Sequence, residues 1–184
     1  MSEVGIRLTG LGGQGVVLSS VILGRAASVY DELKAVQTQT YGSDMRGGDV
    51  CTEIIISKQK IVYPIVNFPD ILIALAQSAF EQHIESIKND GILITDTSLV
   101  KINGIDLPKD VIHYQGDFNK MAIDVFHEKR VANMIMLGFI SKRTSLVTLP
   151  SLKKAMRDLL PPKTHTVNQK ALDLGIELAQ ENSK

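Results

Sequence analysis

Short apolar runs alternate with a longer helical pattern at the start of the chain. Val4–Thr9 is an apolar run that ends in glycine, which predicts a buried strand. Val16–Tyr30 has the length and composition of a buried helix, and Leu33–Thr40 predicts a second strand. Strand, glycine-rich turn, helix and strand in this order are typical of an α/β fold.

The middle of the chain predicts a β-hairpin followed by further α/β units. Two apolar runs, Val50–Ser57 and Ile61–Val66, are separated only by the polar residues Lys58–Lys60, so we expect an inserted hairpin. The next predicted elements are a strand at Asp70–Leu75, a helix at Gln77–Lys88 and strands at Gly91–Ser98 and Val111–Gln115. These later strands are apolar on both faces, which is typical of a parallel sheet covered by helices on each side.

The last third of the chain is helical in its spacing. Apolar residues recur at helical intervals from Phe118 to Ile140, which fits two helices or one bent helix. A short helix stopped by two prolines follows, and Asn168 is placed to cap a final amphipathic helix. We therefore expect one domain over residues 1–184: a three-layer α/β/α fold that is Rossmann-like at its start, with an inserted β-hairpin and a helical C-terminus.

Charge and cysteine content narrow the functional classes. The 184 residues include 20 basic and 20 acidic side chains, and this formal net charge of +0 gives no electrostatic reason to expect nucleic acid or an anionic membrane as a partner. The single cysteine, Cys51, excludes an internal disulfide, and the chain alone cannot supply four thiolates to an iron–sulfur cluster. The N-terminus does not resemble a signal peptide, and the apolar segment Val131–Ile140 is too short to span a bilayer. We therefore expect a cytoplasmic protein.

Gly10–Gly15 reads GLGGQG, which has the G-x-G-x-x-G spacing of a dinucleotide-binding turn. In such a site the phosphate lies at the N-terminus of the following helix, and an acidic residue at the end of the second strand binds the ribose. Here the second strand ends in QTQTYG without a carboxylate, and no Lys-Ser or Lys-Thr follows the glycines as in a kinase-type phosphate loop. A nucleotide site and a tight structural turn both remain open.

Tyr41–Gly48 reads YGSDMRGG and is the other unusual stretch. Arg46 offers a rigid fork of donors for a carboxylate or phosphate, and Gly47 and Gly48 permit close approach of the backbone. The alternative is a turn into the hairpin in which Arg46 pairs with Asp44 or Asp49.

No metal site is predicted. HEKRV, which starts at His127, begins like a helical zinc motif but has Val131 where the second histidine belongs. The other histidines are isolated in sequence, and Cys51 lies in an apolar strand without a basic neighbour, so we interpret it as a small buried apolar residue.

Five blocks of sequence, in this order, resemble the gamma subunit of 2-oxoacid:ferredoxin oxidoreductases. They are TGLGGQGVVLSSVILGRAA, QTYGSDMRGGDVCTEIIIS, YPIVNFPDILIAL, RVANMIMLGFI and VNQKALDLG, and together they run along nearly the whole chain. The forms YGSDMRGG and RVANMIMLG are most similar to the separate gamma subunits of 2-oxoglutarate (2-ketoglutarate) enzymes. The pyruvate, branched-chain 2-oxoacid and indolepyruvate relatives share the domain.

The resemblance implies membership of a complex that decarboxylates a 2-oxoacid on thiamine diphosphate with magnesium. Electrons then pass through iron–sulfur clusters to ferredoxin, and the acyl group passes to coenzyme A. The chain contains neither the Gly-Asp-Gly start of a thiamine diphosphate site nor enough cysteines for a cluster. We therefore expect no catalytic residue and no cofactor on this chain alone, and we assign the chemistry to alpha and beta subunits, with a delta subunit as a further candidate.

The resemblance also suggests where this subunit meets the rest of the complex. The glycine motif is matched by Gly10, Gly12, Gly13 and Gly15, with Gln14 projecting from the loop toward a cofactor. Residues that match the other motifs and are expected at a partner or active-site channel are Tyr41, Asp44, Arg46, Gly47, Gly48 and Asn133. A buried helical asparagine needs partners for both ends of its amide, so we expect Asn133 to hydrogen-bond one of the loops.

Two other functions stay open from the sequence. One is an independent enzyme that binds a dinucleotide or S-adenosylmethionine at the Gly10–Gly15 loop. The other is a stand-alone scaffold or regulatory module.

Overall fold

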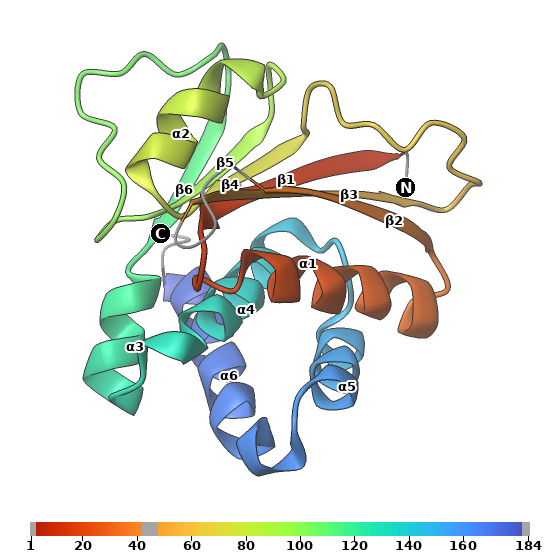
Figure 1. Ribbon diagram of the computed structural model, residues 1–184, viewed down its shortest axis with the longest axis vertical. Helices are drawn as coiled ribbons and strands as arrows, with labels where there is room; N and C mark the ends of the chain where they lie inside the picture. Colours follow the sequence, from red (N-terminus) through yellow and green to blue (C-terminus); the bar gives the residue numbers. More distant parts are fainter. Residues whose placement is uncertain (1–2, 42–47, 182–184) are drawn as a thin grey trace.

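The computed structural model describes residues 3–41 and 48–181, in which six strands form one mixed sheet with helices on both faces (Figure 1). The strand order is β2-β3-β1-β4-β5-β6. The strands are β1 (Val4–Leu11), β2 (Lys34–Tyr41), β3 (Asp49–Ser57), β4 (Ile71–Ala74), β5 (Ile92–Asp96) and β6 (Ile112–Gly116). β1, β4, β5 and β6 are parallel, whereas β3 runs antiparallel to both β1 and β2.

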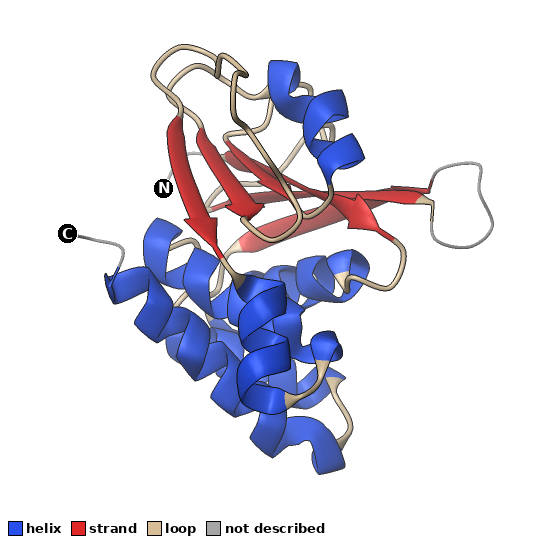
Figure 2. Cartoon of the chain, turned by 90° about the vertical axis from the view of Figure 1, so that its left-hand side faces the viewer, coloured by secondary structure: helices blue, strands red, loops and turns tan. Residues whose placement is uncertain are grey.

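The predicted three-layer α/β/α fold is confirmed. Helix α2 (Gln77–His83) covers one face of the sheet, and the other helices form a layer beneath the opposite face, so the sheet lies between two layers in both views (Figures 1 and 2). That layer holds α1 (Val16–Arg25), which continues as a π-helix (Ala26–Tyr30), with α3 (Phe118–Phe126), α4 (Ala132–Thr144), α5 (Leu149–Leu159) and α6 (His165–Glu181). Short 3-10 helices lie at Ile84–Ser86, Lys129–Val131 and Pro162–Thr164.

The larger hydrophobic core lies between the sheet and the helical layer. Ile6 and Leu8 of β1 are fully buried in it, whereas Arg7 between them lies on the α2 face, as the alternation of a strand requires. Residues 132–141 of α4 are all buried because this helix packs against α1, α3, α5 and α6. The predicted buried helix at Val131–Ile140 is thus confirmed, and no helix among the described residues is long and apolar enough to cross a membrane.

The predicted hairpin of Val50–Ser57 with Ile61–Val66 is wrong, and a different pair of strands forms the antiparallel hairpin of the sheet. Ile61–Val66 forms no strand, and the hairpin consists of β2 and β3, with Lys34 opposite Ser57. Pro64 has no N–H to donate to a sheet ladder, and both edges of β3 are already occupied by β1 and β2.

The structure decides or corrects three of the helical predictions. The helix predicted at Gln77–Lys88 ends at His83 and is followed only by the 3-10 turn Ile84–Ser86. Phe118–Ile140 forms two helices rather than one bent helix, because His127 adopts a left-handed conformation (φ 53°) at the end of α3. The last helix starts at His165, so Asn168 lies in its first turn and its Nδ2 donates to the Thr164 carbonyl at 2.8 Å. Asn168 is therefore not the N-cap.

Candidate functional site

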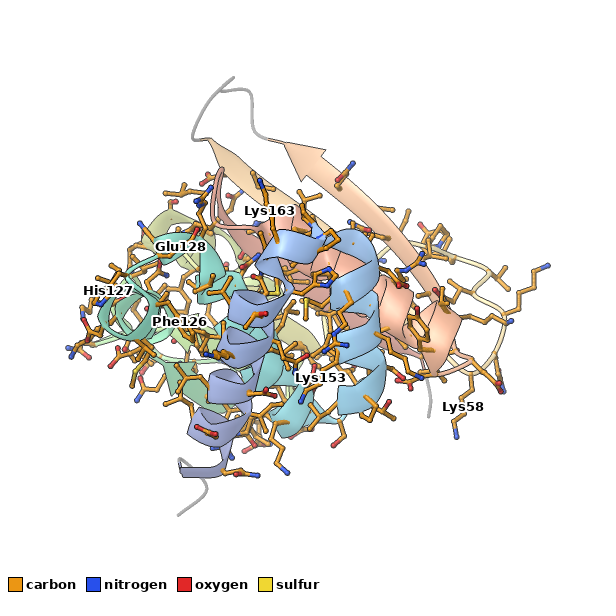
Figure 3. All side chains as sticks on the ribbon, turned by 90° about the horizontal axis from the view of Figure 1, so that it is seen from below. Lys58, Phe126, His127, Glu128, Lys153 and Lys163 are labelled. Carbon is orange, nitrogen blue, oxygen red and sulfur yellow. The ribbon has the colours of Figure 1, made fainter. Side chains whose placement is uncertain are left out.

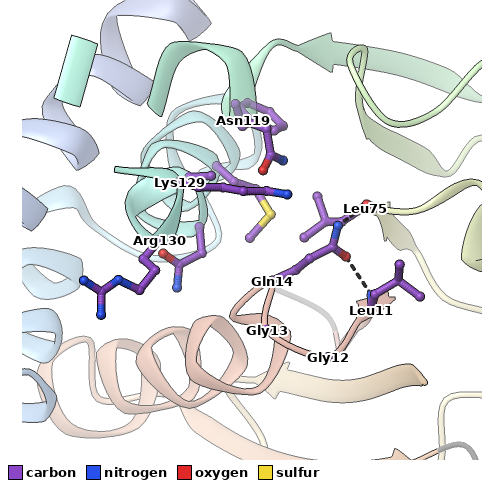
Figure 4. A pocket seen from close by; sticks show the side chains of 12 residues that line it. Leu11, Gly12, Gly13, Gln14, Leu75, Asn119, Lys129 and Arg130 are labelled. Atoms are coloured by element: carbon purple, nitrogen blue, oxygen red, sulfur yellow. Dashed lines mark hydrogen bonds between the residues drawn. The ribbon is translucent and has the colours of Figure 1, made fainter. Parts of the chain in front are cut away.

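A pocket of about 270 Å³ opens at the carboxyl ends of β1 and β4 (Figure 4). Its walls come from the glycine loop, from Leu75 after β4, from the first turns of α3 and α4, and from the Lys129–Val131 turn. Ligands of open α/β sheets bind in the crevice outside the carboxyl ends of the strands. The pocket therefore occupies the position where this fold class places its sites.

Gln14 does not point freely into this pocket. Its Oε1 accepts a hydrogen bond from the Leu11 N–H at 2.6 Å, and its Nε2 donates to the Leu75 carbonyl at 2.7 Å (Figure 4). Both ends of its amide therefore bind the protein itself while the side chain lines the pocket, and a role for Gln14 in cofactor binding stays a prediction. The side chain pins the glycine loop to the end of β4.

The glycines of the loop make this arrangement possible. A Cβ at Gly10 would lie 2.4 Å from Gln14 Oε1, so a side chain there would displace the glutamine. Gly13 (φ 92°) and Gly15 (φ 74°) adopt a left-handed backbone that favours glycine. Gly12 donates its N–H to the Gly48 carbonyl at 3.1 Å, which joins the loop to the end of the YGSDMRGG segment.

Asn133 lies against the same loop from the first turn of α4. Only 6% of its surface is exposed, and a Cβ at Gly15 would lie 2.3 Å from its Nδ2. Its Oδ1 has no hydrogen-bond partner within the part of the chain that the structure describes. The predicted contact with a loop is therefore present, but the expected hydrogen bond for this oxygen is absent. A buried acceptor without a donor on the pocket wall is suited to a ligand that brings an N–H or O–H.

The electrostatics of the pocket favour an anion. Gly15 is the N-cap of α1 and supplies no side-chain cap, and the first turn of α1 holds no acidic residue, so the helix dipole adds positive potential at the glycine loop. Figure 4 shows Lys129 extending across the pocket toward Gln14, whereas Arg130 points away from it. Arg130 pairs with Glu128 at 2.7 Å, and its side chain is 87% exposed.

Asn119, at the start of α3, is fixed on the pocket wall by a buried carboxylate. Asp96, fully buried at the end of β5, accepts hydrogen bonds from the N–H and the Nδ2 of Asn119, both at 2.8 Å. Sequence reasoning missed Asn119 and Lys129. The available signal was Asp96 itself, a carboxylate that directly follows an apolar strand at the edge where ligands bind.

The remaining predicted site residues lie partly outside the described residues. Asp44, Arg46 and Gly47 fall there, and of Tyr41 only the backbone is described, paired with Val50 across β2 and β3. The HEKRV segment is not one continuous helix, because α3 ends at Phe126 with His127 as its C-cap, and a 3-10 turn follows at Lys129–Val131. This break removes the helical spacing on which a zinc motif depends.

A second hollow, on the α2 face, contains Cys51 and His83 but is poorly suited to nucleophilic chemistry. Burial raises the pKa of the Cys51 thiol to about 11, so the thiol stays protonated at neutral pH. Burial also lowers the pKa of His83. The guanidinium of Arg7 is engaged by Glu53, with Nη2 and Oε1 2.6 Å apart, and by Ser86. Cys51 is half-buried rather than buried as predicted, and it lines the hollow.

Comparisons with known proteins agree with the fold and the motifs. The family model described as "Pyruvate ferredoxin/flavodoxin oxidoreductase" matches residues 5–178. The chain is 41% identical over 177 residues to the 2-oxoglutarate synthase subunit KorC of Methanocaldococcus jannaschii, covering 96% of this chain and 94% of that protein.

Solved structures show the same likeness. The gamma subunit of keto/oxoacid ferredoxin oxidoreductase from Geobacter sulfurreducens has a TM-score of 0.83 and 33% identity, covering 98% of this chain and 99% of that chain. The fold also matches 2-oxoglutarate:ferredoxin oxidoreductase from Magnetococcus marinus with 2-oxoglutarate, coenzyme A and succinyl-CoA bound. There the TM-score is 0.85 at 22% identity, over 98% of this chain and 32% of that chain. The chain therefore belongs to the pyruvate ferredoxin/flavodoxin oxidoreductase family, among its gamma subunits.

Proposed function

We propose that this chain is the gamma subunit of a 2-oxoglutarate:ferredoxin oxidoreductase in the cytoplasm. The complex converts the 2-oxoacid and coenzyme A to acyl-CoA, CO2 and reduced ferredoxin. The substrate assignment is supported by the 41% identity to a 2-oxoglutarate synthase subunit over nearly the full length of both chains.

The thiamine diphosphate, magnesium and iron–sulfur chemistry lies on alpha and beta partner subunits, with a delta subunit as a further candidate. This chain has one cysteine and no Gly-Asp-Gly sequence, so it lacks the residues for either site. The purified chain alone is expected to show no oxidoreductase activity.

The alternative, an independent dinucleotide- or S-adenosylmethionine-binding enzyme, is not supported. In a dinucleotide site the second strand lies beside the first and ends in the acidic residue that binds the ribose. Here β3 separates β1 from β2, which places the end of β2 about 10 Å from β1. β2 also ends in Thr40 and Tyr41 rather than a carboxylate.

The pocket at the glycine loop is this subunit's contribution to the coenzyme A channel. The observation that carries this proposal is the unpartnered Oδ1 of buried Asn133, beside the uncapped N-terminus of α1. Coenzyme A offers phosphates for the N–H groups of α1 and for Lys129, and amide N–H and hydroxyl groups for Asn133 Oδ1. In this role Lys129 attracts and holds the anion, and Asn133 orients the neighbouring polar group.

The test uses the chain assembled with the alpha and beta subunits encoded by the same organism. Replacing Lys129 by alanine is expected to raise the KM for coenzyme A about tenfold while the KM for 2-oxoglutarate stays unchanged, because a charge-assisted contact of about 1.5 kcal/mol is lost. The matched control is Lys163→Ala, an exposed lysine between α5 and α6 (Figure 3).

The pocket's role in binding coenzyme A and the assignment of 2-oxoglutarate as substrate can each be contradicted by a separate result. An unchanged KM for coenzyme A in the Lys129→Ala complex would remove the pocket's role in binding coenzyme A. A wild-type complex that oxidises pyruvate but not 2-oxoglutarate would overturn the substrate assignment and leave the pocket's role standing.

A further inference from the structure

The loop between β3 and β4 exposes apolar side chains that a folded chain would ordinarily bury. In the segment Ile61–Phe68, hereafter the apolar loop, Val62 is 85% exposed, Tyr63 and Phe68 are each 62% exposed, and Ile65 is 49% exposed. Isolated exposed apolar residues need no explanation, but several within one short loop indicate a contact surface.

The apolar loop is held firmly to the sheet. The Val66 side chain is buried against Gly5, and the Val66 carbonyl accepts a hydrogen bond from Arg7 Nη2 at 2.5 Å. Two residues after the loop, Asp70 accepts a hydrogen bond from the Gly5 N–H at 2.7 Å and pairs with Lys88 at 2.7 Å. The exposed side chains therefore stand on an ordered backbone, so little entropy is lost when a partner covers them.

A small hollow lies beneath two of these side chains. Ile65 and Phe68 line a hollow of about 230 Å³ together with Ile55 of β3 and Gly5 of β1. Aromatic and aliphatic side chains around such a hollow are typical of the central anchors of protein interfaces, which are surrounded by a polar rim.

The position of the apolar loop separates it from the coenzyme A pocket. β3 ends beside the start of β1, with Ile56 opposite Val4, so the loop lies at the amino ends of the parallel strands. The glycine loop lies at the carboxyl ends of these strands, so the two loops are at opposite ends of β1 (Figure 1). A partner seated on the apolar loop would leave the pocket at Gly10–Gly15 accessible.

The charges beside the apolar loop indicate the chemistry of its partner. Lys58 and Lys60 are exposed in the turn that leads into it, and Figure 3 shows Lys58 pointing outward at the margin of the molecule. Two carboxylates line the hollow itself: Asp70, which is paired with Lys88, and Glu3. Lys58 and Lys60 therefore supply the positive charge at the other side of the loop. A surface with an apolar centre and acidic side chains at its rim would complement this pattern.

We propose that the apolar loop is the docking surface for a partner subunit of the same oxidoreductase, which presents an apolar recess flanked by acidic side chains. This inference rests on the proposed function, because only a subunit of a complex has such a partner. The exposed side chains of the loop, the hollow beneath Ile65 and Phe68, and the charges of Lys58 and Lys60 are the observations that locate this surface.

The experiment co-expresses the tagged full chain with the alpha and beta subunits of the same organism and measures how much of each is retained. The double variant Tyr63→Ala/Phe68→Ala is expected to weaken association at least about 30-fold, the effect of losing one interface hot spot. The matched control Ile123→Ala/Val125→Ala removes two comparably exposed apolar side chains from α3 and is expected to bind as the wild type does.

A second variant tests the chemistry of the partner without removing apolar surface. Lys58→Glu/Lys60→Glu is expected to weaken association several-fold at low salt, with the difference from wild type shrinking as salt rises. Thermal unfolding of each purified chain checks that the surface substitutions leave the fold intact.

The outcomes separate this inference from the proposed function. If wild type assembles and Tyr63→Ala/Phe68→Ala assembles equally well, the docking surface is wrong while the subunit assignment stands. If the isolated wild-type chain dimerises and the double variant is a monomer with unchanged partner binding, the loop joins two copies of this chain and the proposal is overturned. If wild type binds neither subunit, both proposals fail.

Discussion

Glycines in two regions of the molecule, the α4–α6 crossing and the glycine loop, are required for different physical reasons. At the crossing, a Cβ at Gly138 would lie 2.0 Å from the Leu172 carbonyl oxygen, and one at Gly175 would lie 1.9 Å from the Ile135 carbonyl oxygen. Both contacts are with backbone atoms in the middle of a helix. They cannot relax unless the two helices move apart.

In the glycine loop the close neighbours are side chains. A Cβ at Gly10 would meet the amide of Gln14, and one at Gly15 would meet the amide of Asn133. Both side chains line the pocket, and the Gln14 amide also holds the glycine loop to Leu75. Each side chain can move at a modest cost in free energy. The difference suggests that the crossing glycines maintain the fold, whereas the loop glycines maintain the geometry of the site.

The largest predicted effect belongs to the crossing. Gly138→Ala is expected to lower the free energy of unfolding by about 3 kcal/mol or more, because the added methyl group forces α4 and α6 apart. Chemical denaturation measures this loss. Gly24→Ala in α1 is the matched control, since nothing lies within 4 Å of its added Cβ, and it should stabilise the chain by about 0.5–1 kcal/mol. Equal stability of the two variants would show that the helices do not cross this closely.

The next effect is at the junction of the loop and α4. Gly15→Ala is expected to cost about 2 kcal/mol, from its left-handed backbone and from the contact with Asn133. Combining it with Asn133→Ala removes the two closest contacts, with Nδ2 and Cγ, and leaves the Cβ contact at 3.0 Å and the backbone strain. A double-mutant cycle should therefore give a coupling of about 1 kcal/mol, and strictly additive effects would mean that the two residues do not touch.

Replacing Gln14 tests whether its two hydrogen bonds stabilise the glycine loop. Gln14→Ala is expected to cost about 1–2 kcal/mol, since the Leu11 N–H and the Leu75 carbonyl both lose their partner. The exposed Gln82 serves as the control, and its replacement by alanine should change the stability by less than about 0.5 kcal/mol. If the Gln14→Ala chain is as stable as the Gln82→Ala chain, the two hydrogen bonds do not stabilise the loop, and ligand binding is the remaining role for Gln14.

Much of the fold follows from the apolar pattern, and the exception has a physical cause. Runs such as Val4–Thr9 and Val50–Ser57 are apolar because the sheet buries them, so the pattern located them correctly. Ile61–Val66 has the same pattern but is largely exposed. An apolar run predicts a surface that needs covering, and the sequence cannot tell whether the chain itself or another chain covers it.

The site was only half predictable for a related reason. The glycine loop has a fixed spacing, and Asn133 stands out as a polar residue in an apolar helix, so both were identified from the sequence. Asn119 and Lys129 have no signal in their own neighbourhood of the sequence; Asp96 at the end of β5 points to that edge of the sheet, but only the chain's path through β5 and α3 brings the two residues to the end of β1. A pocket assembled from distant segments is visible only once the topology is known.

The smallest predicted loss of stability is at Gly13, where the cost of a left-handed backbone can be measured without a side-chain contact. Gly13 has a φ of 92°, but nothing lies within 4 Å of a Cβ placed there. Gly13→Ala should therefore cost about 1 kcal/mol from the backbone alone, and Gly13→Asn should cost less, because asparagine tolerates the left-handed region better. Denaturation of the two variants beside Gly15→Ala measures the contribution of Asn133 directly. If Gly13→Ala proves as damaging as Gly15→Ala, backbone conformation rather than the contact with α4 explains the loop's glycines.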